Sequence, residues 1–294
     1  MQTCVIFNPS ARGEKALALC AGLESLFPNW VWRRTGQAGQ ARQLAAQAVL
    51  DGFQTIIAGG GDGTANEVVN GIGDVPGAFA STFFGVLPLG TINVFAQELG
   101  LPRRPAAALK VLRQGKTMKI DLGRADYKVA GNPCHRLFLQ LAGAGLDSRA
   151  IELVDWEVKK KVGPLAYIAA GCKALRETQP VIVARGETPV TGEMVLIGNG
   201  RFYGGRFAVF PAASLQDGLL DVYVLPKVTW LRLIAAASGL IIVNFHDFSA
   251  ARFSARSITL TSATRVALQL DGENVCDLPA TLSVQPKTLQ VIVP

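Results

Sequence analysis

The first part of the chain alternates short apolar runs with segments in which apolar positions recur at helical spacing. The apolar runs are Thr3–Phe7, Trp30–Arg33, Thr55–Ala58 and Phe83–Leu87. Between them lie segments of helix-forming composition: Glu14–Leu26, Ala38–Leu50 and Asn66–Gly71. Such alternation is typical of βαβ units and predicts a parallel sheet.

After Gly123 the pattern changes to strand-like runs with frequent glycine and proline. The predicted strands are Leu137–Leu141, Met194–Ile197, Phe207–Phe210, Leu219–Leu225, Ser257–Leu260 and Val266–Leu270. Helical patterns interrupt them at Ser148–Lys161, Pro164–Glu177 and Thr229 to about Asn244. The pattern predicts a second, β-rich domain, most simply a sandwich. We expect an α/β domain over residues 1–122 and the β domain over 123–286, with residues 287–294, and in them the strand Leu289–Val293, as a candidate to rejoin the first domain.

Composition agrees with a two-domain chain that has no membrane span. The chain has 294 residues with 49% hydrophobic content, enough for two cores. The N-terminus has no signal-peptide pattern, and the most apolar window, Leu231–Val243, contains Arg232 and is too short to span a membrane. The five scattered cysteines fit reduced thiols, so we expect a cytoplasmic protein. The net charge of +7 makes an anionic partner plausible, although nothing points to nucleic acid.

The most informative motif is a glycine-rich loop that contains an acidic residue. Gly59 to Thr64, GGGDGT, follows a predicted strand and precedes a predicted helix, with Thr64 placed to cap that helix. Glycines and a helix N-terminus together form a phosphate site. Asp62 would repel a bare phosphate, so it indicates a mediating Mg²⁺ or substrate hydroxyl and hence phosphoryl transfer. A glycine-rich turn kept for steric reasons alone is the simpler alternative.

A second loop, PLGTIN at Pro88 to Asn93, also follows a strand and opens a helix. It would offer backbone amides, a hydroxyl and a carboxamide at the same edge of the sheet, where ligands bind in open α/β folds. Asn8 and Thr35 follow two further strands, so four loops would converge on one site.

Two nucleotide-binding motifs are excluded. Gly115-Lys116-Thr117 resembles the end of a P-loop, but the required upstream glycine position is Lys110, and a strand pattern rather than a helix follows. The dinucleotide fingerprint GxGxxG fails because Asn66 occupies the place of its final glycine.

Six motifs are spread over nearly the whole chain, from Asn8 to Glu273: NPSARG, GGGDGTANEVVNG, PLGTINVFA, GGRF, PAASLQDGLLDV and DGE. In sequence and in order they resemble the diacylglycerol kinase catalytic family, which includes bacterial lipid kinases and sphingosine kinases. The resemblance implies an N-terminal three-layer α/β nucleotide domain, a C-terminal β-sandwich lipid domain and an active site between them. It further implies ATP as phosphate donor, Mg²⁺ as cofactor and a lipid hydroxyl as acceptor.

By the same resemblance, particular residues receive roles. ATP would be held by Asn8, Thr35, Gly60, Gly61, Asp62, Gly63, Thr64, Asn66 and Thr91. Glu273 would orient or deprotonate the acceptor hydroxyl, and Asp62 is the other candidate for the metal or the acceptor. Asp271-Gly272 alone would simply be a hairpin turn, which could present Glu273 to the cleft.

A structural Mg²⁺ loop is implied at Ser214 to Leu219, with the Asp217 carboxylate beside the carbonyls of Ser214 and Leu219. A plain Asp-Gly turn explains the same spacing. Asp121, just before Leu122-Gly123, is a candidate to join an acidic network across the domain boundary. Val94 departs from bacterial diacylglycerol kinases, which often carry Asp at this place, so the resemblance leaves the metal arrangement and the substrate choice open.

The leading hypothesis is a Mg²⁺- and ATP-dependent lipid kinase that visits the membrane surface transiently. Lys159-Lys160-Lys161 and Arg103-Arg104 could meet anionic lipid, although such charge runs usually face water. The alternatives are an NAD kinase or phosphofructokinase-like sugar kinase, which share the GGDGT loop, and a nucleotide-binding regulatory module without turnover. The acceptor lipid and the oligomeric state stay open, with a homodimer as one alternative.

Overall fold

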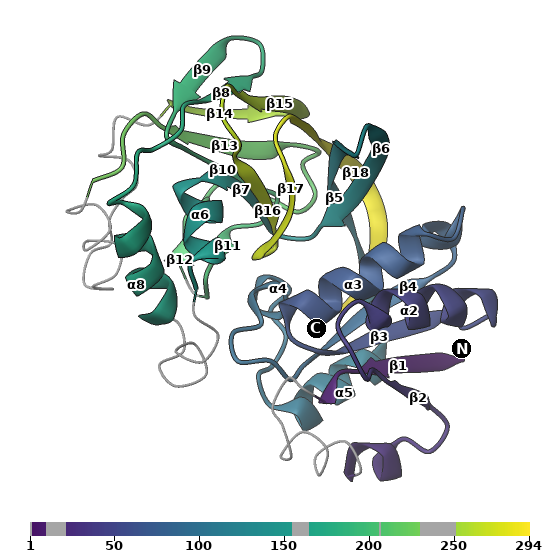
Figure 1. Cartoon of the computed structure of the whole chain (residues 1–294). Coiled ribbons are helices and arrows are strands. Elements are labelled where there is room, and N and C mark those ends of the chain that lie inside the picture. Colours follow the sequence, from purple (N-terminus) through teal and green to yellow (C-terminus); the bar gives the residue numbers. More distant parts are fainter. Residues whose placement is uncertain (1, 10–21, 155–164, 206, 230–250) are drawn as a thin grey trace.

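A computed structural model describes residues 2–9, 22–154, 165–205, 207–229 and 251–294 (Figure 1). The first domain is built on parallel strands in the order β2-β1-β3-β4. Their bounds are β1 Thr3–Phe7, β2 Val31–Arg34, β3 Thr55–Gly60 and β4 Phe83–Pro88. Each lies within two residues of its predicted range. The predicted parallel sheet is confirmed.

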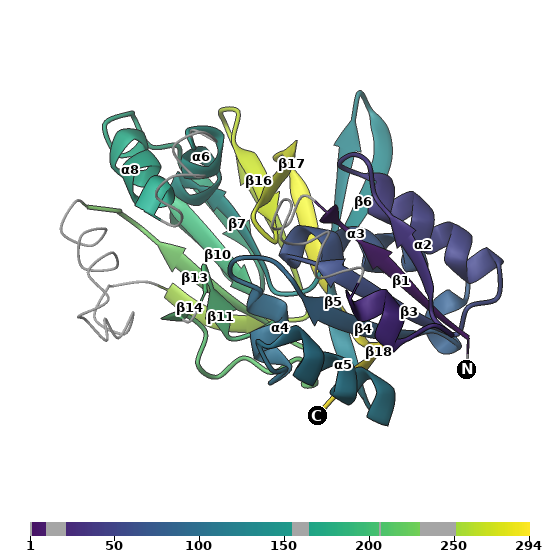
Figure 2. The ribbon, with the colours of Figure 1, turned by 90° about the horizontal axis from the view of Figure 1, so that it is seen from below.

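Helices cover both faces of this sheet and make a three-layer domain (Figure 2). Along β1, side chains alternate between faces, so Cys4 and Ile6 pack with α2 (Gln40–Leu50) and α3 (Asp62–Gly73). Val5 and Phe7 pack instead with α5 (Pro105–Gln114) and Leu23. Two short elements, η2 (Ala78–Ala80) and α4 (Val94–Glu98), complete the domain.

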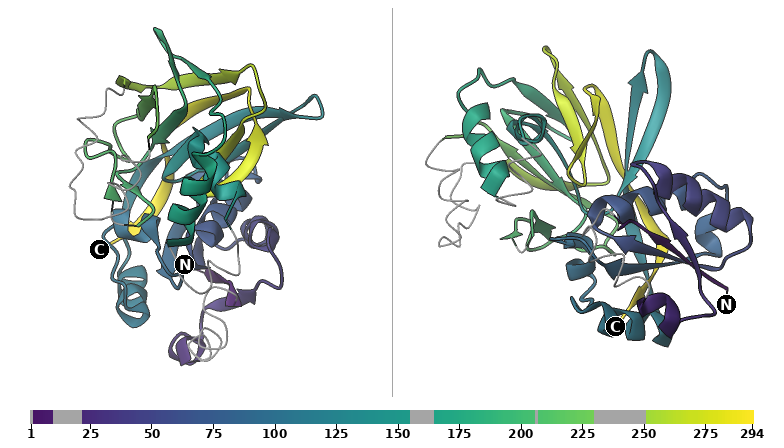
Figure 3. Two further views of the ribbon diagram at one scale, coloured as in Figure 1. Left: turned by 60° about the vertical axis from the view of Figure 1, so that its left-hand side comes forward. Right: turned by 60° about the horizontal axis from the view of Figure 1, so that its bottom comes forward.

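Two long strands connect the domains. β5 (Lys116–Val129) and β18 (Ala280–Val293) pair antiparallel along most of their length. At its end, β18 also pairs parallel with β4, with Gln290 beside Phe83. Earlier in β18, Ser283 pairs with Ser257 of β15 (Ser257–Ser262). One hydrogen-bonded sheet therefore runs from the first domain into the second (Figure 3). The division of the chain at residue 122 remains a proposal.

The second domain is a β-sandwich, as predicted. One layer continues the first sheet through β15, β8 (Ile182–Arg185), β9 (Pro189–Gly192) and β6 (Asn132–Phe138). The other layer has the order β14-β13-β10-β7-β16-β17. Its bounds are Ala251–Ala255, Leu220–Leu225, Met194–Gly198, Leu141–Gly145, Ala267–Leu270 and Glu273–Asp277. A small pair, β11 (Phe202–Tyr203) and β12 (Phe207–Ala208), lies apart.

The sandwich core lies between the two layers. Ile258 and Leu282 from one layer pack with Val195, Val222 and Leu268 from the other, all buried. The outer face of the second layer is covered by α6 (Leu146–Glu152) and α8 (Leu165–Ala174), through residues such as Leu146, Ala174 and Leu196. No helix among the described residues is long and apolar enough to cross a membrane.

Some predicted elements were wrong in detail. Leu137–Leu141 is not one strand, because the N–H groups of Leu139 and Gln140 donate to the Asp271 carboxylate and separate β6 from β7. The predicted strand Phe207–Phe210 ends at Ala208, since Val209 N–H turns back to the Phe207 carbonyl.

Predicted helices correspond only in part. The helix expected at Ser148–Lys161 begins earlier and ends at Glu152, and residues 155–161 lie outside the described residues. The helix expected at Pro164–Glu177 is Leu165–Ala174 in the structure. Most of the helix expected from Thr229, and part of Glu14–Leu26, also lie outside the described residues.

Candidate active site

The two glycine-containing loops pack directly against each other. The N–H groups of Leu89 and Gly90 donate to the Gly60 carbonyl at 2.9 and 3.1 Å. A Cβ on Gly90 would lie 2.5 Å from the Gly61 Cα atom, which is closer than real contacts allow. Glycine at position 90 therefore lets one loop support the other.

Thr64 does not cap the helix, so that expectation was wrong. Helix α3 begins at Asp62 with Gly61 as its N-cap, which places Thr64 in the first helical turn. A side chain on Gly60 would collide with Thr64, so the tight turn needs glycine there and lets the helix start early. The Thr64 hydroxyl instead accepts a hydrogen bond from Asn8 Nδ2 at 3.1 Å.

Asp62 caps a neighbouring helix in this structure. Its two carboxylate oxygens accept the N–H groups of Val94 and Phe95, each at 3.0 Å, at the N-terminus of α4. Asn93, the N-cap of α4, makes no side-chain cap bond, so Asp62 provides one from outside the helix. Burial raises the pKa of Asp62, while the amide bonds oppose that shift. A role for Asp62 toward a metal or the acceptor remains a prediction.

Part of the predicted nucleotide site forms one cavity at the carboxyl edge of the parallel strands. This cavity has a volume of about 290 Å³, and its lining includes the predicted residues Asn8, Thr35, Gly63, Thr64 and Glu273. The other predicted residues do not line it: Gly60, Gly61, Asp62, Asn66 and Thr91. The loop after β4 thus lies behind the glycine-rich loop instead of in the cavity wall.

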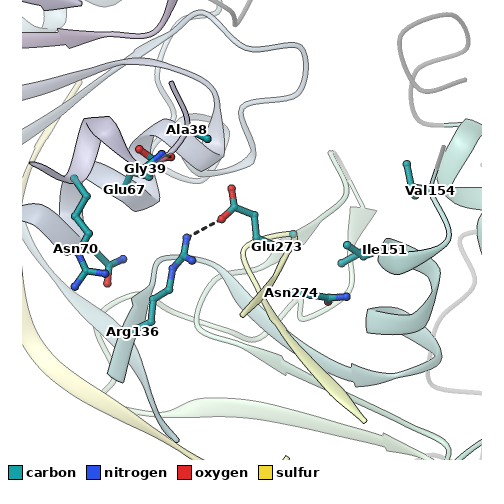
Figure 4. Close-up of a pocket in the computed structure, with 11 residues that line it drawn as sticks. Ala38, Gly39, Glu67, Asn70, Arg136, Ile151, Val154, Glu273 and Asn274 are labelled. Atoms are coloured by element: carbon teal, nitrogen blue, oxygen red, sulfur yellow. Dashed lines mark hydrogen bonds and ion pairs between the residues drawn. The ribbon is translucent and has the colours of Figure 1, made fainter. Parts of the chain in front are cut away.

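A larger cavity, of about 620 Å³, opens between the two domains. The first domain contributes Ala38, Gly39 and Glu67, among others, and the second contributes Ile151 of α6 and Val154, which follows that helix (Figure 4). Glu273 lines both cavities. Glu273 therefore lies between the smaller cavity, which polar loop residues line, and the larger cavity, which has an apolar wall.

A two-residue hairpin presents Glu273. Asp271 and Gly272, between β16 and β17, have φ values of 48° and 89°, as a two-residue turn with left-handed residues requires. The predicted hairpin is confirmed. The Asp271 carboxylate accepts the N–H groups of Leu139, Gln140 and Leu141 at 2.7, 2.9 and 3.1 Å, which fixes the turn against the β6-β7 connection.

Asn66 serves the contact between the domains. Its Nδ2 atom donates to Asp271 at 2.8 Å and to the Leu137 carbonyl at 2.9 Å. Its Oδ1 atom accepts from Arg136 and from Asn70 Nδ2. These hydrogen bonds tie the Asn66 carboxamide to the second domain, and Asn66 lines neither cavity.

Sequence reasoning missed Arg136 and Glu67. Arg136 Nη2 lies 2.7 Å from Glu273 Oε2, and the two side chains point toward each other in Figure 4. The Glu67 carboxylate accepts the N–H groups of Gly39 and Ala41 at 2.9 and 3.0 Å and so holds the start of α2 at the cavity rim. No local pattern marks either residue, because each acts through a contact distant in sequence.

The predicted Mg²⁺ loop is a fixed structure. The buried Asp121 carboxylate accepts the N–H groups of Gly218 and Lys287 at 2.7 and 2.6 Å, and Asp121 N–H donates to the Leu215 carbonyl. Asp121 therefore holds these backbone segments in place. In place of the expected acidic network, the Asp121 carboxylate makes hydrogen bonds with backbone N–H groups. Asp217 Oδ1 accepts Leu219 N–H at 3.0 Å.

The donor set of this loop fits a hard divalent cation. Asp217 lies close enough to Asp221 that its charge adds to burial in raising the Asp221 pKa, and a cation would relieve that repulsion. The Asp217 carboxylate and the Ser214 and Leu219 carbonyls are oxygen ligands of the type that Mg²⁺ prefers. Among the described residues, no group of three His, Cys, Asp or Glu side chains could hold a metal, so carbonyls and water would have to complete the shell.

Comparison with known proteins agrees with this architecture. Residues 2–125 match the family described as "Diacylglycerol kinase catalytic domain", and residues 140–293 match the "YegS C-terminal NAD kinase beta sandwich-like domain". A solved structure from Bacillus anthracis str. Sterne superposes with a TM-score of 0.79 at 24% identity, covering 100% of this chain and 95% of that one. Another from that organism, titled as a diacylglycerol kinase, gives 0.72 at 21%, covering 100% and 97%. These two likenesses show the fold.

Fold and site together define the class: a two-domain protein with a diacylglycerol kinase catalytic domain and an NAD kinase-like β-sandwich. Similar proteins of known family show to which group within this class the chain belongs. A "Probable lipid kinase YegS-like" of Pseudomonas aeruginosa (strain UCBPP-PA14) is 31% identical over 99% of this chain and 93% of its own length. One of Xanthomonas euvesicatoria pv. vesicatoria is 32% identical over 89% and 86%. The chain belongs to this YegS-like lipid kinase family.

Proposed function

We propose that the protein is an ATP-dependent lipid kinase that transfers the γ-phosphate of ATP to a lipid hydroxyl. The observation that carries the proposal is the position of Glu273, which lines both the loop-lined cavity and the larger interdomain cavity. A carboxylate between a phosphate site and an apolar-walled space is where an acceptor hydroxyl would meet a phosphoryl donor. Family membership supports the reaction class.

The proposed mechanism assigns positions to this chain's own groups. The polyphosphate lies on the backbone N–H groups of Gly63 and Thr64 at the N-terminus of α3, with Asn8 and Thr35 at its side. The acceptor hydroxyl hydrogen-bonds to Glu273, which takes its proton as the oxygen attacks phosphorus. Mg²⁺ would neutralise charge on the β- and γ-phosphate oxygens. Asp217, with the Ser214 and Leu219 carbonyls, would hold a structural ion.

The lipid would enter from the side of the second domain, where Ile151 and Val154 form the apolar wall. We propose a cytoplasmic enzyme that adsorbs transiently to the membrane surface. The net charge of +7 favours such adsorption to anionic lipid. Of the basic runs noted in the sequence, Lys159 to Lys161 lie outside the described residues.

The test is transfer of labelled γ-phosphate from ATP, with Mg²⁺, to lipids in mixed micelles. The panel holds diacylglycerol, monoacylglycerol, sphingosine, ceramide, phosphatidylglycerol and, as a soluble acceptor, NAD⁺. We expect label in one lipid class. Glu273→Gln should lower kcat by about 10²–10⁴-fold, the usual contribution of a positioned acid or base.

The matched control is Glu187→Gln, an exposed residue that lines neither cavity, which should keep the wild-type rate. Transfer of label to NAD⁺ would show that the phosphate acceptor is a soluble molecule and would contradict the proposed lipid acceptor. Nucleotide binding without label in any acceptor would point to a regulatory module. A wild-type rate in Glu273→Gln would remove the role given to that carboxylate.

A further inference from the structure

Phosphoryl transfer spreads negative charge over the oxygens of the transferred group, and kinases place cationic groups there. The glycine-rich loop offers only backbone N–H groups and the partial charge of a helix N-terminus. Among the described residues that line the two cavities, the positively charged side chains are Arg42 and Arg136. Their surroundings differ in a way that separates their roles.

Arg42 is committed to a carboxylate away from the loop. Its Nε and Nη2 atoms each lie 2.6 Å from an oxygen of Asp74, the C-cap of α3. The hydrogen bonds that Arg42 donates to the Asp74 carboxylate raise the pKa of Arg42. Because α3 has 12 residues, its C-terminal end lies about 18 Å from its N-terminal turn. The Arg42 guanidinium therefore stabilises the far end of the helix.

Arg136 is paired instead with the proposed proton acceptor. Its Nη2 atom lies 2.7 Å from Glu273 Oε2. The other oxygen, Glu273 Oε1, lies against the first turn of α3, where a Cβ on Gly63 would be 3.2 Å away. The carboxylate thus spans the space between the phosphate-binding turn and the guanidinium, as Figure 4 shows for the Arg136 side.

Elementary geometry then limits where the phosphoryl group can lie. An acceptor oxygen in hydrogen-bond contact with Glu273 is about 3 Å from the carboxylate. The same oxygen attacks phosphorus from about 3–3.5 Å. The transferred group consequently lies within about 6–7 Å of the carboxylate. The Arg136 guanidinium, 2.7 Å from that carboxylate, is therefore a cation next to this position.

The Arg136 side chain is held ready for this position. Its Nε and Nη2 atoms donate to Asn66 Oδ1 at 3.2 and 3.0 Å. The orientation of the Asn66 amide is fixed in turn by its donation to Asp271. The Arg136 side chain is only 20% exposed. Preorganised charge of this kind stabilises a transition state with little rearrangement.

We propose that Arg136 is the cation that stabilises the phosphoryl group during transfer, an inference that rests on the proposed kinase function. As the bond from the acceptor oxygen to phosphorus forms, the bond from phosphorus to the β,γ-bridging oxygen breaks. The electron pair leaves with ADP on that oxygen. The hydroxyl proton passes to Glu273, and the Arg136 guanidinium, still held by Asn66, exchanges its hydrogen bond with Glu273 for one with the oxygens of the group in transfer.

The experiment compares wild-type protein with Arg136→Gln, Arg136→Lys and Arg136→Ala in the lipid assay and in nucleotide binding. We expect kcat of Arg136→Gln to fall about a thousandfold, as for other arginines that contact a transferred phosphoryl group. The ADP dissociation constant should stay within about threefold, while affinity for ADP with aluminium fluoride, a transition-state mimic, falls at least about a hundredfold. Millimolar guanidinium should restore part of the Arg136→Ala rate.

Arg124→Gln is the matched control, because Arg124 lies on the adjacent strand β5, pairs with Asp126 and lines neither cavity. A kcat within threefold of wild type in Arg136→Gln would overturn the inference and leave the kinase function standing. Equal losses for ADP and for ADP with fluoride would also overturn it. No labelled acceptor with wild-type protein would remove both proposals. Arg136→Lys keeps the charge, so a folded Lys variant tests the inference even if Arg136→Gln fails to fold.

Discussion

Asp147 is a buried carboxylate that the proposed reaction does not use. It accepts the Tyr203 hydroxyl and, at 2.8 Å, Gln269 Nε2. Gln269 Oε1 accepts the N–H of Gly272, the residue before Glu273. The buried Gln269 amide thus connects Asp147 to the turn that presents the proposed proton acceptor.

Burial raises the pKa of Asp147, and this has a consequence for stability. The folded state holds the proton at a pH where the unfolded chain has already released it. Stability from this group is therefore present at low pH and lost as pH rises through the raised value. Relative to Asp147→Asn, the wild-type free energy of unfolding should fall as pH rises above about 4, by at most about 1.4 kcal/mol per pH unit.

Urea unfolding at a series of pH values measures this difference. Tyr203→Phe serves as the comparison, since it removes a hydrogen bond and keeps the carboxyl group, so its pH slope should follow the wild type. A difference between wild type and Asp147→Asn that does not change with pH would contradict the prediction.

At the scale of elements, the two loops after β3 and β4 pack together and act as one support for the proposed phosphate site. Gly90→Ala would place a methyl group 2.5 Å from the Gly61 Cα atom, a backbone contact that cannot yield cheaply. We expect a loss of about 1–3 kcal/mol in the free energy of unfolding, typical of overpacking. ATP binding should weaken at least about tenfold, because about 1.4 kcal/mol of loop displacement has that effect.

Urea unfolding and ATP titration measure the two effects. Gly36→Ala is the matched control, because the nearest atom to its new Cβ, Gln40 Oε1, is 3.5 Å away. Normal ATP affinity in a folded Gly90→Ala protein would show that the two loops do not depend on each other.

Elements with a regular hydrophobic pattern were predictable, and interrupted ones were not. The parallel strands and α2 lie close to their expected bounds, since buried apolar runs and helical spacing mark them. β18 was expected only at Leu289–Val293, because Pro286-Lys287 interrupts its pattern. The structure accommodates the interruption with a register shift between Gln285 and Leu289, where Asp121 accepts the Lys287 N–H.

In the candidate site, too, residues in local sequence motifs were predictable and residues placed by distant contacts were not. The loop motifs identified Asn8, Thr35, Gly63, Thr64 and Glu273, and the structure brings these residues to one cavity. Arg136 could not be found this way, because its pairing with Glu273 crosses 137 residues of sequence. Such a contact depends on how the sandwich places β6 relative to the β16-β17 hairpin. No local sequence pattern predicts this placement.

At the scale of the molecule, Asp271 connects the domains at one point. Its carboxylate accepts three backbone N–H groups of the β6-β7 connection and the amide of Asn66 on α3. In Asp271→Asn, the side-chain NH₂ group would face N–H groups that now donate to a carboxylate oxygen. Asparagine tolerates the left-handed backbone at this position, so the substitution leaves the turn conformation available. We expect a loss of about 1–3 kcal/mol in the free energy of unfolding, the cost of leaving buried donors unsatisfied.

Urea unfolding measures this loss. Asp277→Asn, on the same hairpin, is the control: its partner Arg265 has a side chain that is 74% exposed, so the pair should contribute less than about 1 kcal/mol. Equal stability of the two variants would show that Asp271 is not a point of coupling between the domains.

The shared strand β18 affects how the chain can fold during synthesis. Residues 280–293 supply a neighbour to β4 in the first domain and to β5 and β15 in the second. A nascent chain in which this segment is still inside the ribosome therefore lacks the strand that joins the two domains' parts of the shared sheet. Domains usually fold in order as they emerge, the N-terminal one first. Here the shared sheet would be completed in both domains only once residues 280–293 have emerged, and until then the exposed edge of β4 would be open to pairing with other chains.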